Sequence, residues 1–241
     1  MTQLEEKAIE ILKSYGDPAC YEQMVQNIQR DKADVLVAEK EGVMLRSRCE
    51  GFYMLAGSEQ GISSLIDRIP AGAQDVVIHG TMPDWVIEKA KMVHGLTHVD
   101  PFVLYAYYEE LPPEETETEI RVLGKESLDF VYENYGHGSR PYIESRIADG
   151  VMIGAYVDGQ LAAFIGEHAE GAMGLLHVMP DYRRHHLGYK LELEAIRRTM
   201  LRGYTPFCQV FLDNEASHRL QSRLRMTRSD GSVYWMSAGA E

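Results

Sequence analysis

One stretch of the chain constrains its fold more than any other, because it joins a strand, an abrupt stop and a helix start. A mostly apolar run over residues 175–178 leads into Pro180, which lacks a backbone N–H and therefore ends a strand. A short basic loop follows, and we expect a helix to begin at about Leu187. The first N–H groups of a helix lack partners within it and carry partial positive charge. The stretch therefore predicts a strand–loop–helix unit that binds phosphate.

The loop itself suits a pyrophosphate group. Arg183 and Arg184 lie beside the expected helix start, where guanidinium groups pair well with phosphate oxygens. His185 and His186 raise the question of a metal site, but no carboxylate or cysteine follows at ligand spacing, so we predict no metal. The candidate phosphate-binding residues are Arg183, Arg184, His185, His186, Leu187, Gly188 and Tyr189.

The charge of the chain favours a compact anionic ligand over nucleic acid. The 241 residues carry a formal net charge of −13, whereas nucleic-acid phosphates need a basic protein surface. Between Asp181 and Arg228, however, there are ten lysines and arginines and only five aspartates and glutamates. A basic region within an acidic protein suits a nucleotide cofactor.

Two further features bear on where the protein acts. No apolar run approaches the roughly 20 residues that span a bilayer, and the acidic N-terminus is unlike a signal peptide. Cys20, Cys49 and Cys208 are widely spaced and form no CxxC pair, which indicates reduced thiols. We therefore expect a cytoplasmic protein with no membrane partner. The sequence leaves the oligomeric state open, and a homo-oligomer is compatible with it.

The apolar residues follow helix and strand periodicities in alternation, which predicts an α/β fold with a mixed sheet covered by helices. Residues 111–119 contain two prolines and four glutamates, a composition typical of a linker. This linker separates an N-terminal half, residues 1–110, from a C-terminal domain, residues 120–241. The two halves show a similar order of elements and could be two versions of one fold.

The expected elements are as follows. In the first half we expect helices over 4–12, 21–28, 62–69 and 84–91, and strands over 35–38, 43–45, 51–56, 76–79 and 102–108. In the second half we expect strands over 120–123, 151–157, 161–167, 174–178, 207–212 and 232–236, and helices over 128–135, 142–148, 188–201 and 216–224. Asp158-Gly159 predicts a tight hairpin turn.

The loop residues resemble the GNAT superfamily of N-acetyltransferases, and within it the glycine N-acyltransferase-like group. The family's cofactor loop reads Arg/Gln-x-x-Gly-x-Gly/Ala after a Val-x-Pro strand end, as in Val178-x-Pro180 followed by Arg183 to Gly188. His186 stands where that pattern has its first glycine. The resemblance covers about residues 120–236. Over the first half it rests on element order alone, which is similar to a degenerate GNAT-like half.

A second match lies in the helix expected at 216–224. Asn214, Ser217 and Leu220 are similar to the family's Asn-x-x-Ala/Ser-x-x-Leu pattern, which lies near the pantetheine arm of coenzyme A. Asn214 is also expected to cap this helix on its own chemistry. The wider family has a tyrosine acid one position after that leucine, where this chain has Gln221, which cannot donate a proton as an acid.

The resemblance implies that acetyl-CoA or another acyl-CoA is the co-substrate. It implies that the strand residues His177, Val178 and Met179 expose backbone amides to the thioester, and we assign oxyanion stabilisation to Val178. The family's general base aligns with about Ala172. We assign that role to Glu170 instead, because a carboxylate shielded from water can have a suitably raised pKa.

Other groups near this strand leave the base open: Glu167, His168 and His177 are alternatives. The function expected is an acyl-CoA-dependent N-acyltransferase that acts directly on a small amine or amino acid in a ternary complex. Glycine as acceptor is what the resemblance suggests. The alternative is a non-catalytic coenzyme A-binding or regulatory protein. A Rossmann-type nucleotide protein is disfavoured, because the Gly-x-Gly-x-x-Gly spacing is missing.

Overall fold

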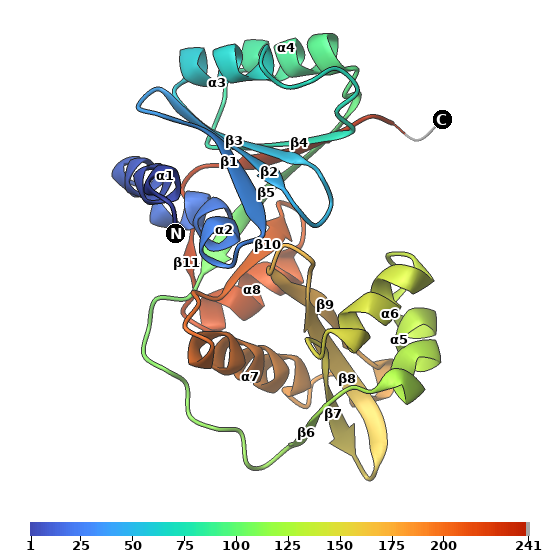
Figure 1. Cartoon of the computed structure of the whole chain (residues 1–241). Coiled ribbons are helices and arrows are strands. Elements are labelled where there is room, and N and C mark those ends of the chain that lie inside the picture. Colours follow the sequence, from blue (N-terminus) through green and yellow to red (C-terminus); the bar gives the residue numbers. More distant parts are fainter. Residues whose placement is uncertain (240–241) are drawn as a thin grey trace.

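A single mixed sheet runs through both halves of the protein, as the computed structural model of residues 1–239 shows (Figure 1). Within these residues the sheet has twelve strands, in the order β1-β2-β3-β4-β12-β5-β10-β9-β8-β7-β6, and β11 (Thr227–Arg228) pairs with β5. The helices cover the sheet. The predicted α/β fold with a mixed sheet is confirmed.

The first half contributes four helices and five strands within the described chain. They are α1 (Gln3–Ser14), α2 (Pro18–Gln29), β1 (Ala33–Glu39), β2 (Gly42–Ser47), β3 (Tyr53–Gly57), α3 (Glu59–Ile66), β4 (Asp75–His79), α4 (Asp84–His94) and β5 (His98–Ala106). The strand β6 (Glu119–Val122) opens the second half, after an irregular segment that runs along the outside of the molecule (Figure 1).

The second half repeats the order of elements seen in the first. It continues with α5 (Leu128–Tyr135), α6 (Arg140–Ala148), β7 (Ile153–Val157), β8 (Gln160–Glu167), β9 (Met173–Val178), α7 (Leu187–Leu201), β10 (Phe207–Phe211), α8 (Glu215–Arg223) and β12 (Val233–Ser237). In each half two helices precede three antiparallel strands, and a helix then crosses to a parallel fourth strand. The two halves are therefore variations on one arrangement.

The last strand of each half pairs with the other half. β12 pairs with β4, where Val233 lies opposite His79, and β5 pairs with β10, where Phe102 lies opposite Phe211. β12 and β5 also pair with each other. The two halves that the sequence divides at residues 111–119 consequently share one sheet, and each closes an edge of the other.

Local sequence explains most element boundaries. Asp158 and Gly159 both have positive φ, 50° and 78°, as the expected tight turn between β7 and β8 requires. Gly203 follows α7 with a φ of 83°. Asp84 is the first helical residue of α4, because the extended Pro83 takes the cap position and makes no side-chain cap bond. Every helix of the described residues is too short or too polar to cross a bilayer.

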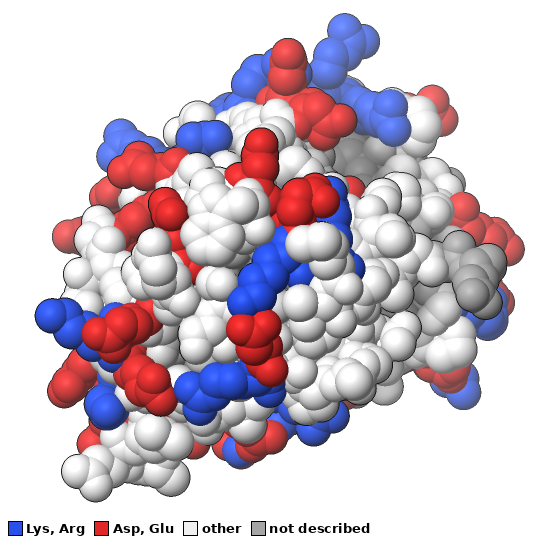
Figure 2. Space-filling view, turned by 90° about the horizontal axis from the view of Figure 1, so that it is seen from above, with Lys and Arg blue, Asp and Glu red and all other residues white. Residues whose placement is uncertain are grey.

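The helices of the second half pack on opposite faces of the sheet. α7 and α8 lie on one face and α5 and α6 on the other, each over its own apolar cluster (Figure 1). Between these layers runs β9, which is irregular at Leu175, where φ is 57°. Leu175 packs on the α5 side, whereas Val178 packs on the α7 side. On the face shown in Figure 2, acidic and basic side chains are interspersed with uncharged ones.

Candidate cofactor and active site

The sheet opens between β9 and β10. These parallel strands pair at one position, Met173 opposite Cys208, and within the described chain they do not pair beyond it towards their carboxyl ends. The corresponding strands of the first half, β3 and β4, remain paired at four successive positions from Tyr53 to Ala56. In open α/β sheets ligands bind beyond the carboxyl ends of strands, so the second half provides the candidate site.

The Val178 amide faces this opening. The N–H of the next residue, Met179, donates a 3.0 Å hydrogen bond to the carbonyl of Ala162 in β8. Because successive residues of a strand direct their backbone groups to opposite edges, the Val178 N–H and carbonyl point away from β8. The carbonyl accepts a 3.2 Å hydrogen bond from Nε of Arg183 on that edge. A preorganised N–H therefore stands in the opening, and its role towards a thioester stays a prediction.

The loop after β9 has the backbone shape of a glycine-containing turn. Arg184 and His186 both adopt the left-handed conformation, with φ of 67° and 60°. For a residue with a Cβ this costs about 1–2 kcal/mol, which glycine avoids. His186 thus keeps the conformation expected of glycine at that position. The first helical bond runs from the Lys190 N–H to the His186 carbonyl, at 3.0 Å, so the preceding amides of α7 have no partner within the helix.

A shallow hollow of about 220 Å³ lies over this helix start. Its walls come from the loop, from α7 and from α8, and the lining residues are Val178, Tyr182, Arg183, Arg184, His186, Leu187, Gly188, Tyr189, Leu220 and Arg223. The structure thus brings together most of the predicted phosphate-binding residues. His185 is exposed and lies outside this set.

Arg223 is a member of the hollow that sequence reasoning missed. Its guanidinium lies 3.1 Å from Nδ1 of His186 and stacks 4.6 Å above the ring of Tyr189. It follows Gly188 by more than thirty positions and sits on another helix, where an exposed arginine looks like ordinary surface charge. Only the packing of α8 against α7 brings it to the loop, where it adds a third guanidinium beside Arg183 and Arg184.

The equivalent position in the first half is closed. Between β3 and α3 the Ser58 N–H donates to the carbonyl of Glu41, at 3.0 Å, so the β1–β2 turn lies where a ligand would enter. A Cβ on Gly61 would stand only 1.8 Å from that same carbonyl oxygen. The first half therefore has neither an open strand pair nor a free helix start at this point.

Comparison with known proteins agrees with this geometry. The sequence model of the acetyltransferase (GNAT) family matches residues 105–224. This chain has a GNAT acetyltransferase fold. A Drosophila protein of known structure is similar over 97% of this chain and 95% of its own, with a TM-score of 0.61 and 17% identity. No curated protein matches the sequence.

Two named relatives share the same fold over nearly their whole length. A GCN5-related N-acetyltransferase from Kribbella flavida covers 91% of this chain and 96% of its own, with a TM-score of 0.54 and 12% identity. A GCN5-related N-acetyltransferase-like protein from Streptococcus suis covers 97% and 98%, with a TM-score of 0.53 and 12% identity. These likenesses concern the fold.

The second GNAT-like motif lies on α8. The side chain of Asn214 caps this helix by accepting a 3.1 Å hydrogen bond from the Ser217 N–H, as predicted. Neither residue lines the hollow at the loop. Arg225, just after this helix, has a φ of 59° and so adopts the left-handed conformation. The cofactor-binding role of Asn214 and Ser217 stays a prediction.

Gln221, at the position of the GNAT tyrosine, is buried and committed to another partner. Its Nε2 donates a 2.7 Å hydrogen bond to Oε1 of Glu192 on α7. Oε1 of Gln221 and Oε2 of Glu192 are buried with no partner among the described residues. Burial raises the pKa of Glu192 to about 7. A protonated Glu192 can donate its O–H to Gln221, which completes a reciprocal acid–amide pair between the two helices.

Glu170, the predicted base, lies in the turn before β9 and is buried rather than solvated. Burial raises its pKa to about 7, against the opposing effect of Lys32 and Arg146. The strand between this turn and Val178 rises about 17 Å, so the structure does not bring the two predicted catalytic residues together. The turn is instead held by the first half, where Asn27 donates to the Glu170 carbonyl at 3.3 Å.

His177 lies next to Val178 on β9. Its ring stacks on Phe164, with 5.5 Å between ring centroids, and lies on the α5 side of the sheet. Burial and the nearby Arg183 charge lower the pKa of His177, which favours the neutral imidazole. Of the alternatives for the base, it is the one adjacent to the Val178 amide. His168 lies at the far end of β9, where Nδ1 contacts the Tyr142 hydroxyl at 2.8 Å.

The remaining alternatives have structural partners. Glu167 is buried and pairs with Arg202 and, at 3.5 Å, with Arg30 of the first half. Ala172, at the position of the family's general base, is fully buried and has no titratable group.

Residues 1–239 contain no group of three or more histidine, cysteine, aspartate or glutamate residues arranged to hold a metal ion.

Proposed function

We propose that this protein is an acyl-CoA-dependent N-acyltransferase that transfers an acetyl or related acyl group directly to a small amine or amino acid. The observation that carries the proposal is the opening between β9 and β10, with the Val178 amide on its edge and three guanidinium groups at its mouth. An anionic diphosphate suits the helix start and the arginines. The pantetheine arm would then extend between the strands towards Val178.

The chemistry follows from that position. The amine nitrogen attacks the thioester carbonyl carbon, the C–N bond forms, and the negative charge develops on the carbonyl oxygen beside the Val178 N–H. The C–S bond then breaks and the thiolate leaves. The amine proton passes to a base. Since Gln221 holds no acidic proton and is bonded to Glu192, the thiolate takes its proton from water or another group.

We assign the base to His177, the alternative closest to Val178 in sequence, in preference to Glu170. A lowered pKa keeps the imidazole neutral and able to accept the proton at neutral pH. His177 also lies on the face of the sheet away from α7. An acceptor amine would approach from that face, opposite the hollow over the start of α7.

The acceptor is expected to be a small molecule, and the glycine N-acyltransferase-like group supplies glycine as the first to test. The first half would help to wall the acceptor site through β5, which lies beside β10. A cytoplasmic setting accords with three free cysteines, of which Cys49 is exposed.

The decisive experiment measures release of free thiol from acetyl-CoA in the presence of a pooled library of small amines and amino acids. We expect thiol release above the rate without amine, and loss of both cofactor binding and release in Gly188→Asp. Cofactor binding is measured separately by calorimetry. Binding without any amine-dependent thiol release would overturn the enzymatic function.

One observation favours a second candidate, a non-catalytic coenzyme A-binding protein. Gln221 replaces the expected acid and is locked against Glu192, so the departing thiolate lacks the family's proton donor. Such a protein would bind acetyl-CoA and free coenzyme A in the same hollow and release no thiol with any amine. The same two measurements therefore separate the candidates.

A further inference from the structure

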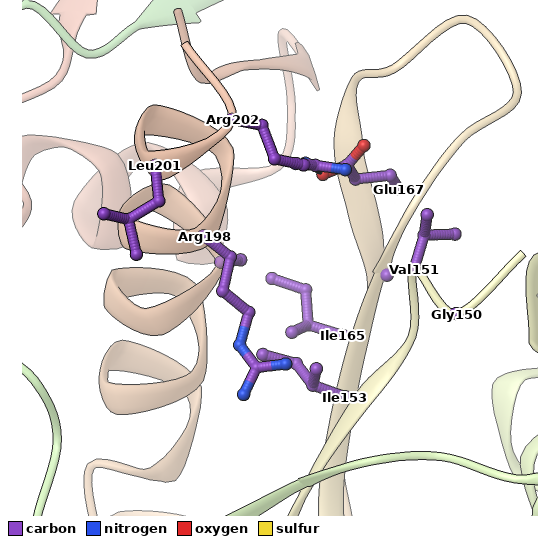
Figure 3. A pocket seen from close by; sticks show the side chains of 10 residues that line it. Gly150, Val151, Ile153, Ile165, Glu167, Arg198, Leu201 and Arg202 are labelled. Carbon is purple, nitrogen blue, oxygen red and sulfur yellow. Dashed lines mark hydrogen bonds and ion pairs between the residues drawn. The ribbon is translucent and has the colours of Figure 1, made fainter. Parts of the chain in front are cut away.

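A second cavity lies at the opposite end of α7 from the cofactor loop. It has a volume of about 340 Å³ and lies between the last turns of α7 and the strands β7 and β8 (Figure 3). Its lining residues are Gly150, Val151, Ile153, Ile165, Gly166, Glu167, Ala195, Arg198, Leu201 and Arg202. The 15 residues of α7 extend about 22 Å, so this cavity is separate from the hollow at the helix start.

The cavity has apolar walls and a charged rim. The walls include the apolar side chains of Val151, Ile153, Ile165 and Ala195. Figure 3 shows Arg198 extending into the gap between α7 and the strands that carry Ile153 and Ile165. A predominantly apolar pocket of about 300–1,000 Å³ with a few convergent polar groups is the usual form of a small-molecule site.

The two arginines at the rim of the cavity, Arg198 and Arg202, are each held by a carboxylate. Arg198 donates from Nε to Glu194, at 2.7 Å, and Arg202 pairs with Glu167. Their side chains nevertheless remain 37% and 42% exposed. A guanidinium has five N–H donors, so each arginine keeps donors for a ligand after these contacts. The carboxylate contacts fix the arginines in place and so reduce the entropy lost on binding.

The charge around this cavity is opposite in sign to that of the chain. Glu167 also pairs, at 3.5 Å, with the buried Arg30, which does not line the cavity but adds a positive charge behind it. Together the rim and this buried group hold three guanidinium groups, from Arg30, Arg198 and Arg202. Two carboxylates, from Glu167 and Glu194, oppose them and leave one positive charge. The whole chain carries −13. A surplus of one charge matches a singly charged anion better than a phosphate.

We infer that this cavity binds a small amphipathic monocarboxylate, with its carboxylate on Arg198 and Arg202 and its hydrocarbon part against Val151, Ile153 and Ile165. Carboxylates pair with guanidinium groups in a planar, two-bond geometry. The apolar walls suit a saturated chain and offer no partner for further polar groups. The site is independent of the proposed acyltransfer, because it lies at the other end of α7.

The test titrates the full chain with octanoate, and with octylamine as a cation of the same length, by calorimetry. We expect octanoate to bind with 1:1 stoichiometry and octylamine not to bind. Saturating coenzyme A should leave octanoate affinity unchanged, since the cofactor hollow is elsewhere. Binding of both ligands alike, or displacement of octanoate by coenzyme A, would overturn the inference.

Variants locate the site. Ala195→Phe fills the cavity and should abolish octanoate binding, and Arg198→Gln should weaken it about tenfold by removing one charge-assisted pair. Arg197→Gln is the matched control, because Arg197 lies on the same helix, pairs with Glu114 at 3.7 Å and does not line the cavity. Its octanoate affinity should equal that of the wild type. Thermal unfolding checks that each variant folds.

If Ala195→Phe does not fold, Arg198→Gln and its control decide the matter alone. Equal loss of affinity in Arg197→Gln and Arg198→Gln would show nonspecific attraction of the anion to α7, and the inference would then fail. Saturable binding that survives Arg198→Gln unchanged would equally contradict it.

Discussion

His177 and Glu170 lie at the two ends of one strand, and their surroundings shift their pKa values in opposite directions. Burial and Arg183 lower the pKa of His177 below its ordinary 6.5. Burial raises the pKa of Glu170 to about 7. A general base works only in its deprotonated form, so the rate falls as the pH drops through its pKa. The two residues therefore predict that the rate falls at different pH values on the acid side of its pH profile.

For an active enzyme we expect kcat/KM to fall on the acid side with an inflection below pH 6.5, which His177→Gln removes. That substitution should lower kcat by about 10²–10⁴, the usual contribution of a positioned base. Glu170→Gln should leave this acid-side fall of kcat/KM unchanged. An inflection near pH 7 that disappears in Glu170→Gln would return the role to the carboxylate.

Single residues also show what the sequence could and could not reveal. The loop was predictable because Pro180, the arginines and the helix start are close together in the chain, and local chemistry dictates their geometry. His186 replaces a glycine of the family pattern, and its φ of 60° shows that the backbone still makes the glycine-like turn. Arg223 was missed because it reaches the loop only through packing of α8.

At the level of the helix, substitutions of Gly188 are expected to affect cofactor binding without lowering stability. A Cβ added there would meet Val178 and Leu176 at 3.5 and 3.8 Å, which are ordinary contact distances. Gly188→Ala should therefore fold and bind normally. Gly188→Asp places a carboxylate at the positive end of α7, which favours the helix by about 0.3–1 kcal/mol. The same charge repels a diphosphate.

We therefore expect Gly188→Asp to keep or raise the midpoint of thermal unfolding while coenzyme A affinity falls by more than about tenfold. Gly188→Ala serves as the matched control, and calorimetry with coenzyme A measures both. Unchanged affinity in Gly188→Asp would place the diphosphate away from this helix start.

The same helix contains buried acids that periodicity did not reveal. Helical periodicity places Leu191, Leu193, Ile196 and Met200 on one apolar face of α7. Leu191 and Ile196 are fully buried, but Leu193 and Met200 are only partly buried, whereas Glu192 is only 3% exposed. Hydropathy assigns a glutamate to solvent. The burial of Glu192 could not be read from the helix alone, because its hydrogen-bonding partner, Gln221, comes from another helix.

Glu192 should make stability depend on pH. Its pKa is about 7 in the folded state against an ordinary 4.5, so between these values the folded protein binds more protons than the unfolded chain. Stability then falls as the pH rises from about 4.5 to 7, by at most about 1.4 kcal/mol per pH unit for each such group. Glu170 contributes in the same direction.

Glu192→Gln keeps a hydrogen-bonding partner for Gln221 and cannot ionise. Denaturant unfolding between pH 5 and 8 should show a shallower loss of stability than in the wild type, and greater stability at pH 8. Glu215→Gln, on the exposed surface of α8, is the control and should follow the wild-type curve. Identical slopes in Glu192→Gln and the wild type would mean that Glu192 is not protonated near neutral pH.

At the scale of the whole molecule, the sequence predicted the alternation of elements and the mixed sheet, but not the exchange of last strands. Periodicity identifies a strand and its buried face, and it says nothing of which strand lies beside it. β12 pairs with β4, whose residues lie more than 150 positions earlier. A strand pair of such long sequence separation is found only by folding the complete chain.

That exchange makes a firm prediction about the linker. A protease site inserted between Pro113 and Glu114, which are both exposed, can be cut in the folded protein. Because β5 lies between β10 and β12, and β12 lies against β4, separating the two fragments would expose strand edges and apolar core in both. We expect the cut protein to elute as one species and to unfold in one transition. A control variant that is cut in the same place and lacks residues 233–239 should lose its first half from the complex or aggregate. Fragments that separate in native buffer while β12 is intact would show that each half is stable alone.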